Sequence, residues 1–348
     1  MHISMTLGYA GSFKKAASQV VEMEKAGLDM VWVPEAYSFD SVSVMGYLAA
    51  VTERVRIASG ILPIYTRTPT LLAMTAAGLD ALSDGRFVLG LGASGPQVIE
   101  GFHGVAYDAP LGRTREIIEI CRKVWAREAP LEHEGRYYHL PLPEDQGTGL
   151  GKPLKIIGRP NPDIPVWIAA IGEKNVSLAA EVADGWLPIF FVPEKARDVW
   201  KSSLEAGRAK RSAHLAPLQI AAGGVLAIGE NDEVTAVREM GRPQLALYIG
   251  GMGAKGTNFY NTLCQRYGYE KAAAEIQDLY LCGKKDEAAA KIPDELVAGV
   301  SLAGPKSFVA ERIAAMKEAG VTHLNVTPVP VGDQTVPELI STVKEMVG

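Results

Sequence analysis

The sequence contains few cysteines and no long apolar segment. Its three cysteines, Cys121, Cys264 and Cys282, are far apart and outside any CxxC spacing, so we predict free thiols rather than a disulfide framework or a metal site. No window approaches about 18 consecutive apolar residues, and the N-terminus lacks a basic stretch followed by a long apolar one. We therefore expect a cytoplasmic protein that does not contact a membrane.

An excess of positive charge is also absent. The 348 residues carry 35 Lys and Arg against 40 Asp and Glu, with the signs interspersed. Nucleic-acid binding needs clustered basic residues, so the sequence predicts none. A hydrophobic content of 47% and 36 glycines indicate a folded chain with a substantial core and many tight turns. We expect a single domain over residues 1–348, because a closed α/β barrel with an insertion reaches this length.

Short apolar runs alternate with segments of helical periodicity along most of the chain, which is typical of parallel βα units. The eight expected strands cover 2–9, 30–36, 55–65, 86–93, 164–171, 186–192, 218–228 and 323–329. Eight strands rich in Val, Ile and Leu favour a (β/α)8 TIM barrel over an open doubly wound sheet. Residues 229–300 have mostly helical periodicity, and we predict that they form an insertion between strands 7 and 8.

Glycine follows four of the predicted helices, at Gly27, Gly85, Gly185 and Gly320. We predict that each adopts a positive φ at a helix C-cap, which allows a short turn into the next strand. A separate hairpin is expected at 131–141, and we predict that its two histidines, His133 and His139, are solvated.

The stretch VLGLGASGPQ (88–97) contains Gly90-x-Gly92-x-x-Gly95, which has the form of a dinucleotide-binding fingerprint. That fold needs a long helix after the third glycine and an acidic residue about 20 residues later, at the end of a strand. Here only a short helix fits after Gly95, and Glu116 lies within a predicted helix. We predict instead that Gly90 and Gly92 make room inside a barrel strand.

The loops after the predicted strands form the active site in such a barrel. They are rich in Gly, Pro, small polar residues and aromatics, and poor in titratable side chains; the stretches are 34–39, 59–69, 92–97, 169–175 and 188–195. This composition suits a flat, largely uncharged ring held by backbone amides, whereas a hydrolase needs acids, bases or metal ligands. The sequence therefore favours a redox ring at this end of the barrel.

Four segments carry a resemblance to a known family: EKAGLDMVWVPE, RIASGILPIYTRTP, GRFVLGLGASGPQVIEGF and IPVWIAAIGEKNVSLAAEVADGWLP. The chain resembles the luciferase-like flavin and deazaflavin oxidoreductases, most closely the branch that uses coenzyme F420. The resemblance implies an enzyme that transfers a hydride between the deazaflavin C5 and an unidentified small organic substrate. An FMN-dependent two-component monooxygenase and a non-catalytic flavin-binding protein remain the alternatives. We also expect a homodimer or a higher homo-oligomer.

The resemblance also implies a cofactor site. The family has a non-prolyl cis peptide at the end of the third strand, which corresponds here to Gly60–Ile61. Its acidic residue at the ring edge corresponds to Glu35, and its phosphate-binding backbone to Ile171 and Gly172. The full expected set is Glu35, Ser59, Gly60, Ile61, Ala93, Ser94, Gly95, Pro96, Gln97, Ala170, Ile171, Gly172, Lys174 and Asn175.

The sequence also departs from the sugar-phosphate dehydrogenases of that branch. Ala36 stands where they carry a histidine, and SGPQ replaces their carboxylate after the fourth strand, which argues against glucose 6-phosphate as substrate. The candidate catalytic residues are His103 as a proton donor, Gln97 as a hydrogen-bonding group and Glu35.

Three further residues are expected to contact substrate, namely Tyr37, Tyr65 and Arg67; for Arg67 a surface ion pair is the alternative. The Gly-rich stretch GGMGAKGTNFYN (250–261) in the insertion is a candidate plug, lid or dimer contact, and these alternatives stay open.

Overall fold

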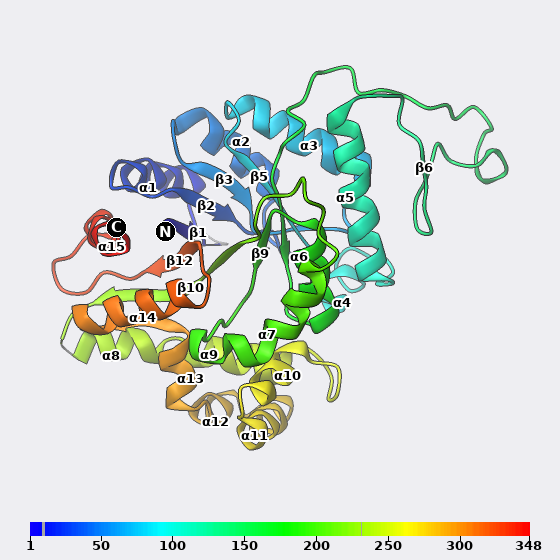
Figure 1. Ribbon diagram of the computed structural model, residues 1–348. Coiled ribbons are helices and arrows are strands. Elements are labelled where there is room, and N and C mark those ends of the chain that lie inside the picture. Colours follow the sequence, from blue (N-terminus) through cyan, green and yellow to red (C-terminus); the bar gives the residue numbers. More distant parts are fainter. Residues whose placement is uncertain (9–10, 231) are drawn as a thin grey trace.

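Eight parallel strands form a closed barrel in the computed structural model, which describes residues 1–8, 11–230 and 232–348 (Figure 1). Each strand pairs with the next around the ring, and β10 closes it by pairing with both β9 and β12. The barrel strands are β1 (His2–Thr6), β2 (Met30–Val33), β3 (Arg56–Ser59), β5 (Phe87–Gly92), β8 (Val166–Ala169), β9 (Gly185–Leu187), β10 (Gln219–Ile228) and β12 (His323–Pro328). The predicted TIM barrel is confirmed. Tyr9, in the first predicted strand, and Asn231, in the predicted insertion, lie outside the described residues.

Four short strands lie outside this ring. β4 (Leu62–Pro63) pairs with β5, so the strand expected over 55–65 is split in two. β11 (Ser301–Gly304) pairs with the C-terminal end of β10 and was not predicted. β6 (His133–Glu134) and β7 (His139–Leu140) form the expected antiparallel hairpin.

Helices surround the barrel and follow its strands (Figure 1). Those packed around the ring are α1 (Phe13–Lys25), α2 (Ser41–Val51), α3 (Pro69–Leu82), α5 (Pro110–Ala126), α6 (Glu173–Val182), α7 (Pro193–Arg208), α14 (Lys306–Glu318) and α15 (Val336–Val347). A short helix α4 (Pro96–Ile99) follows β5, and a 3-10 turn η1 covers Glu144–Gln146.

The expected helical insertion follows β10 and lies on the side of the barrel opposite α2 and α3 (Figure 1). Its elements are α8 (Asp232–Glu239), α9 (Arg242–Ala246), the π-helical turn η2 (Leu247–Gly251), α10 (Phe259–Arg266), α11 (Glu270–Leu281), α12 (Lys285–Ala290) and α13 (Asp294–Gly299). The chain then returns to the barrel through β11.

Three of the four predicted glycine turns are confirmed. Gly27, Gly85 and Gly320 have φ of 103°, 80° and 89°, a region that favours glycine. The prediction for Gly185 was wrong, since this residue lies within β9 and is absent from the residues with positive φ. A Cβ on Gly185 would lie 2.1 Å from the ring of Trp167, so space for a buried indole explains this glycine.

The fingerprint glycines serve the barrel wall, as predicted. The Ser59 hydroxyl donates to the Gly90 carbonyl and accepts from the Gly90 N–H, both at 2.8 Å. A Cβ on Gly90 would lie 1.9 Å from the Ser59 carbonyl oxygen, and one on Gly92 would lie 2.8 Å from the Ile61 side chain. Gly95 precedes only the four-residue α4, and Glu116 lies in α5, so neither residue serves a dinucleotide.

The prediction that His133 is solvated was wrong. Its side chain is buried, with Nε2 3.4 Å from the Glu116 carboxylate. Glu116 also accepts hydrogen bonds from the backbone N–H groups of Arg136, Tyr137 and Tyr138. Burial raises the pKa of Glu116, but these donors outweigh burial and the net pKa is lowered. The hairpin is thus fastened to α5 by one carboxylate.

The cysteines are free thiols, with Cys121 and Cys264 buried and Cys282 exposed. Among the described residues, no group of three or more His, Cys, Asp or Glu side chains could hold a metal ion. Within the same residues, no helix is both long and apolar enough to cross a membrane.

His323 lies at the N-terminal end of the barrel, where the side chain packs edge-on against Trp167 with ring centroids 5.2 Å apart. Burial, followed by the charges of His2 and Arg56, lowers the pKa of His323 to about 3. A histidine that is neutral in the folded protein takes up a proton when the chain unfolds below pH 6.5. Its contribution to stability is therefore complete near neutral pH and is lost as the pH falls toward 3.

The substitution Gly90→Ala is expected to lower the free energy of unfolding by about 2–3 kcal/mol, because the new methyl group overlaps a backbone oxygen. Gly78→Ala is the matched control, since a Cβ there meets nothing within 4 Å and α3 should gain about 0.5–1 kcal/mol. Urea denaturation measures both. Equal effects of the two substitutions would contradict the close approach at Gly90.

Acid sensitivity provides a second test of the barrel. Between pH 7 and pH 5, His323 is expected to account for a loss of about 2 kcal/mol in the free energy of unfolding. In His323→Phe this part of the loss should vanish, while the contributions of carboxylates persist. Urea midpoints of both proteins at the two pH values provide the measurement, and identical pH slopes would refute the assignment.

Candidate active site

The expected site residues come from four loops at one end of the barrel, where β2, β3, β5 and β8 end. The ends of parallel strands meet at a common rim, and this rim is the usual place for an active site in a TIM barrel. The structure therefore brings the sequence-predicted residues to one mouth. Their individual roles stay predictions.

Glu35, after β2, is held by a network of polar contacts. Its carboxylate binds the Arg67 guanidinium through two hydrogen bonds of 2.6 and 3.0 Å and accepts from the N–H and hydroxyl of Ser41. Arg67 also binds Asp40, 2.9 Å away, which caps α2. Burial lowers the pKa of Arg67, but the hydrogen bonds and charges of Glu35 and Asp40 outweigh burial and raise it. Arg67 thus fixes the loop that carries Glu35.

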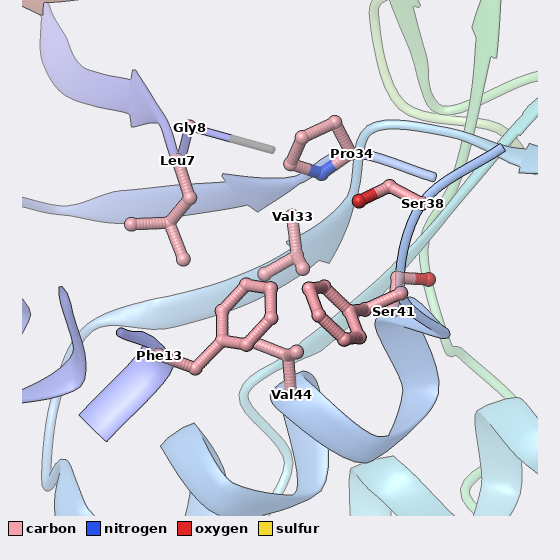
Figure 2. A pocket seen from close by; sticks show the side chains of 9 residues that line it. Leu7, Gly8, Phe13, Val33, Pro34, Ser38, Ser41 and Val44 are labelled. Carbon is pink, nitrogen blue, oxygen red and sulfur yellow. The ribbon is translucent and has the colours of Figure 1, made fainter. Parts of the chain in front are cut away.

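A small apolar pocket lies beneath the same loop. Figure 2 shows Phe13, Val33 and Val44 directed toward one another there, with Ser38 and Ser41 at the edge. The Phe13 ring meets the Phe39 ring edge-on at 5.2 Å. This packing supports the Glu35 loop from below.

The predicted cis peptide between Gly60 and Ile61 is confirmed. It directly follows β3, and the Ile61 side chain that it carries is the one closest to Gly92 of β5. Ser59 is fully buried and its hydroxyl is engaged by Gly90, so only its backbone can serve a ligand. The chain at the end of β3 therefore presents peptide groups and an apolar side chain to the mouth.

The loop after β5 is exposed and contains a left-handed residue. Ser94 has φ 59°, which is uncommon outside glycine and clusters at functional sites. Pro96 and Gln97 begin α4 and are exposed, with Ala93 and Gly95 partly buried beside them. His103 is also exposed, and its ring lies edge-on to Phe102 at 5.1 Å.

The loop after β8 leads into the N-terminus of α6. Gly172 is the N-cap and offers no side-chain cap, so backbone donors of the first turn point outward. Lys174 is exposed, and the Asn175 Oδ1 atom is buried with no hydrogen-bond partner among the described residues. The carbonyls of Ala170 and Ile171 accept from the indoles of Trp186 and Trp200. This helix end has the features of an anion site.

The two tyrosines expected to contact substrate differ in their surroundings. Tyr37 is 67% exposed. Tyr65 is partly buried, its ring is tilted by 39° against the Tyr107 ring at 5.1 Å, and its hydroxyl donates to the Asp108 carbonyl at 2.7 Å. Burial, followed by the Tyr107 hydroxyl, raises the pKa of Tyr65, so this hydroxyl stays protonated.

Sequence reasoning missed the aromatic residues that the insertion brings to the rim. Phe259 is the side chain nearest to Gly172, and Tyr248 and Tyr260 contact Phe190, which follows β9. The available signal was a pair of aromatics within the Gly-rich stretch 250–261, but periodicity does not reveal which loops they meet. Phe190 itself has φ 52°, a second left-handed residue at the mouth.

Arg67→Met is expected to lower the free energy of unfolding by about 2 kcal/mol, because it leaves the largely buried Glu35 carboxylate unpaired. The double variant Glu35→Gln/Arg67→Met should recover much of this loss. Lys25→Met is the control, since the Lys25–Glu22 pair is exposed and its removal should cost less than about 0.5 kcal/mol. Purely additive single and double variants in urea denaturation would disprove coupling between Glu35 and Arg67.

Comparison with known proteins agrees with this geometry. A protein of Mycobacterium tuberculosis, provisionally named as a coenzyme F420-dependent oxidoreductase, is 42% identical over 330 residues that cover 94% of this chain and 95% of the relative. The structure of the coenzyme F420-dependent tetrahydromethanopterin reductase from Methanopyrus kandleri superimposes with a TM-score of 0.76, at 22% identity and with 99% and 98% of the two chains covered. An F420-dependent secondary alcohol dehydrogenase in complex with an F420–acetone adduct superimposes with a TM-score of 0.75, at 18% identity and with 100% and 99% covered.

A family model supplies the remaining comparison. The model of the luciferase-like monooxygenases matches residues 1–323, which include seven of the eight barrel strands and the first residue of β12. The chain belongs to the luciferase-like monooxygenase family.

Proposed function

We propose that this protein is an F420-dependent oxidoreductase that transfers a hydride between the deazaflavin C5 and a small organic substrate. One observation carries the proposal: a relative named as a coenzyme F420-dependent oxidoreductase is 42% identical along almost the whole of both chains. The cis peptide at Gly60–Ile61 and the loops at the mouth support it.

The residues of the mouth fit such a cofactor. The open N-terminus of α6 suits its phosphate, since unpaired N–H groups and the helix dipole attract anions. The Oδ1 atom of Asn175, in the same turn, is buried and unpartnered, and rotation of the amide by about 180° would place its NH2 group there as a donor to an anion. Peptide groups after β3 and the small residues Ala93 and Gly95 leave a flat ring access to the backbone.

When bound, F420 supplies a ring carbon that accepts or donates a hydride. The chain itself contributes positioning and the exclusion of water. We assign phosphate binding to Gly172, Lys174 and Asn175, and the shape of the ring site to the Glu35 loop that Arg67 holds. His103 is the proton-carrying group in this proposal, because its imidazole is exposed at the rim and an imidazole is a common general acid and base.

The substitution Asn175→Asp separates cofactor binding from folding. A carboxylate in the first turn of α6 favours the helix dipole, which offsets the cost of its buried oxygen, so the protein should still fold and the melting temperature should change little. The same carboxylate repels the cofactor phosphate, and the dissociation constant for F420 should rise about tenfold. Quenching of F420 fluorescence measures the dissociation constant.

Ser307→Asp is the matched control, because it adds the same charge to the exposed first turn of α14. It should leave F420 binding unchanged. Failure of the unsubstituted protein to bind F420, together with tight binding of FMN and oxygen consumption with reduced FMN, would replace the proposal by a flavin monooxygenase.

A further inference from the structure

Six aromatic side chains from four separate segments meet at the mouth of the barrel. We call them the aromatic collar, and they are Tyr37, Phe102, Phe190, Tyr248, Phe259 and Tyr260. Tyr37 follows β2, Phe102 follows α4 and Phe190 follows β9, while the other three belong to the insertion. The first three residues thus belong to loops that follow barrel strands, and the insertion brings the other three to the mouth from outside those loops.

Ring contacts join five members of the collar into two groups, and Phe259 lies beside Gly172. The rings of Tyr37 and Phe102 lie 6.2 Å apart. Tyr248 meets Phe190 edge-on at 5.3 Å and Tyr260 at 4.7 Å. The two groups of rings stand on different loops of the same mouth, since Tyr37 and Phe102 follow β2 and α4 whereas Phe190 follows β9.

The insertion holds its part of the collar rigidly. Asn258 is 2% exposed and donates to the carbonyls of Tyr248 and Ile249, at 2.9 and 3.0 Å. Its Oδ1 atom accepts from the N–H groups of Tyr260 and Asn261, which caps α10. One buried amide therefore ties the π-helical turn η2 to the helix that carries Phe259 and Tyr260. Such turns often accompany functional sites.

Three members of the collar are nevertheless largely open to solvent. Tyr37, Phe102 and Phe259 are 67%, 64% and 64% exposed, which is unusual for aromatics held within a fixed frame. Two arginines near these loops are already paired, Arg67 with Glu35 and Asp40 and Arg266 with Glu173, and the exposed Lys174 is assigned to the cofactor phosphate. A charged ligand would have to compete with these ion pairs, whereas an uncharged one would not.

We propose that the aromatic collar is the substrate-binding wall of the mouth and that it selects an uncharged, largely apolar organic molecule. The inference that this molecule is the substrate of a reaction rests on the proposed function. The inference that it binds does not, because it is drawn from the contacts and exposure of the collar residues alone. For the stretch 250–261 the sequence left a plug, a lid and a dimer contact as alternatives. We assign it instead to the substrate site.

Acetophenone and benzoate are suitable probes, since both carry one phenyl ring and only benzoate is charged. Saturation-transfer NMR titrations with the whole protein, with and without F420, yield their affinities. We expect acetophenone to bind at least tenfold more tightly than benzoate. Phe102→Ser and Phe259→Ser should each weaken acetophenone binding about fivefold, because each removes an aromatic contact. Leu281→Ser, at a similarly exposed position at the end of α11, should not change it.

Each outcome decides the inference. Equal or tighter binding of benzoate, no binding of acetophenone in either form, or equal effects of all three substitutions would overturn it. A different result would reject the proposed function and not the inference about the collar. In that case the protein would not quench F420 fluorescence, but acetophenone would still bind and Phe102→Ser would still weaken its binding.

Discussion

The contact between Ser59 and Gly90 determines how the mouth of this barrel is built. Two hydrogen bonds join the hydroxyl of Ser59 to the backbone of Gly90, and no side chain fits between the two strands. The close approach brings the end of β3 against β5, where Gly92 leaves space for Ile61 after the cis peptide. The backbone that faces the mouth therefore follows from one serine and two glycines.

Around that backbone, charged and apolar groups are arranged for different tasks. The ion pairs of Arg67 with Glu35 and Asp40 are satisfied within the protein and hold the β2–α2 loop in place. The aromatic rings of the collar bury only part of their apolar surface against one another, and the rest stays exposed to solvent. Fixed charge thus shapes the site, and unsatisfied apolar surface remains for a ligand.

Much of the fold was predictable because the barrel repeats one local pattern. Apolar strands, helix periodicity and turn glycines such as Gly27 are properties of short windows, whereas the positions of Glu35 and Gly60 at strand ends were expected only from the family resemblance. β11 was missed because its four residues pair only with the end of β10 and do not belong to the repeated βα sequence pattern. The burial of His133 depends on Glu116, and the fixation of Glu35 on Arg67, at separations of 17 and 32 residues that periodicity does not connect. Side-chain partners of this kind appear only when the chain is folded.

The segment that follows the β6–β7 hairpin projects away from the barrel in Figure 1, and the hairpin and segment are attached to the barrel at two places. One attachment is the Glu116 carboxylate, which holds the hairpin. The other consists of two hydrogen bonds, from the Leu131 N–H to the Leu154 carbonyl and from the Arg127 Nε to the Ile156 carbonyl. Residues 141–153 are mostly exposed, so changes of length there are expected to leave the barrel strands intact. This segment is therefore expected to tolerate substitutions and insertions, and it offers a place to insert a foreign peptide or a reporter without disturbing the enzyme.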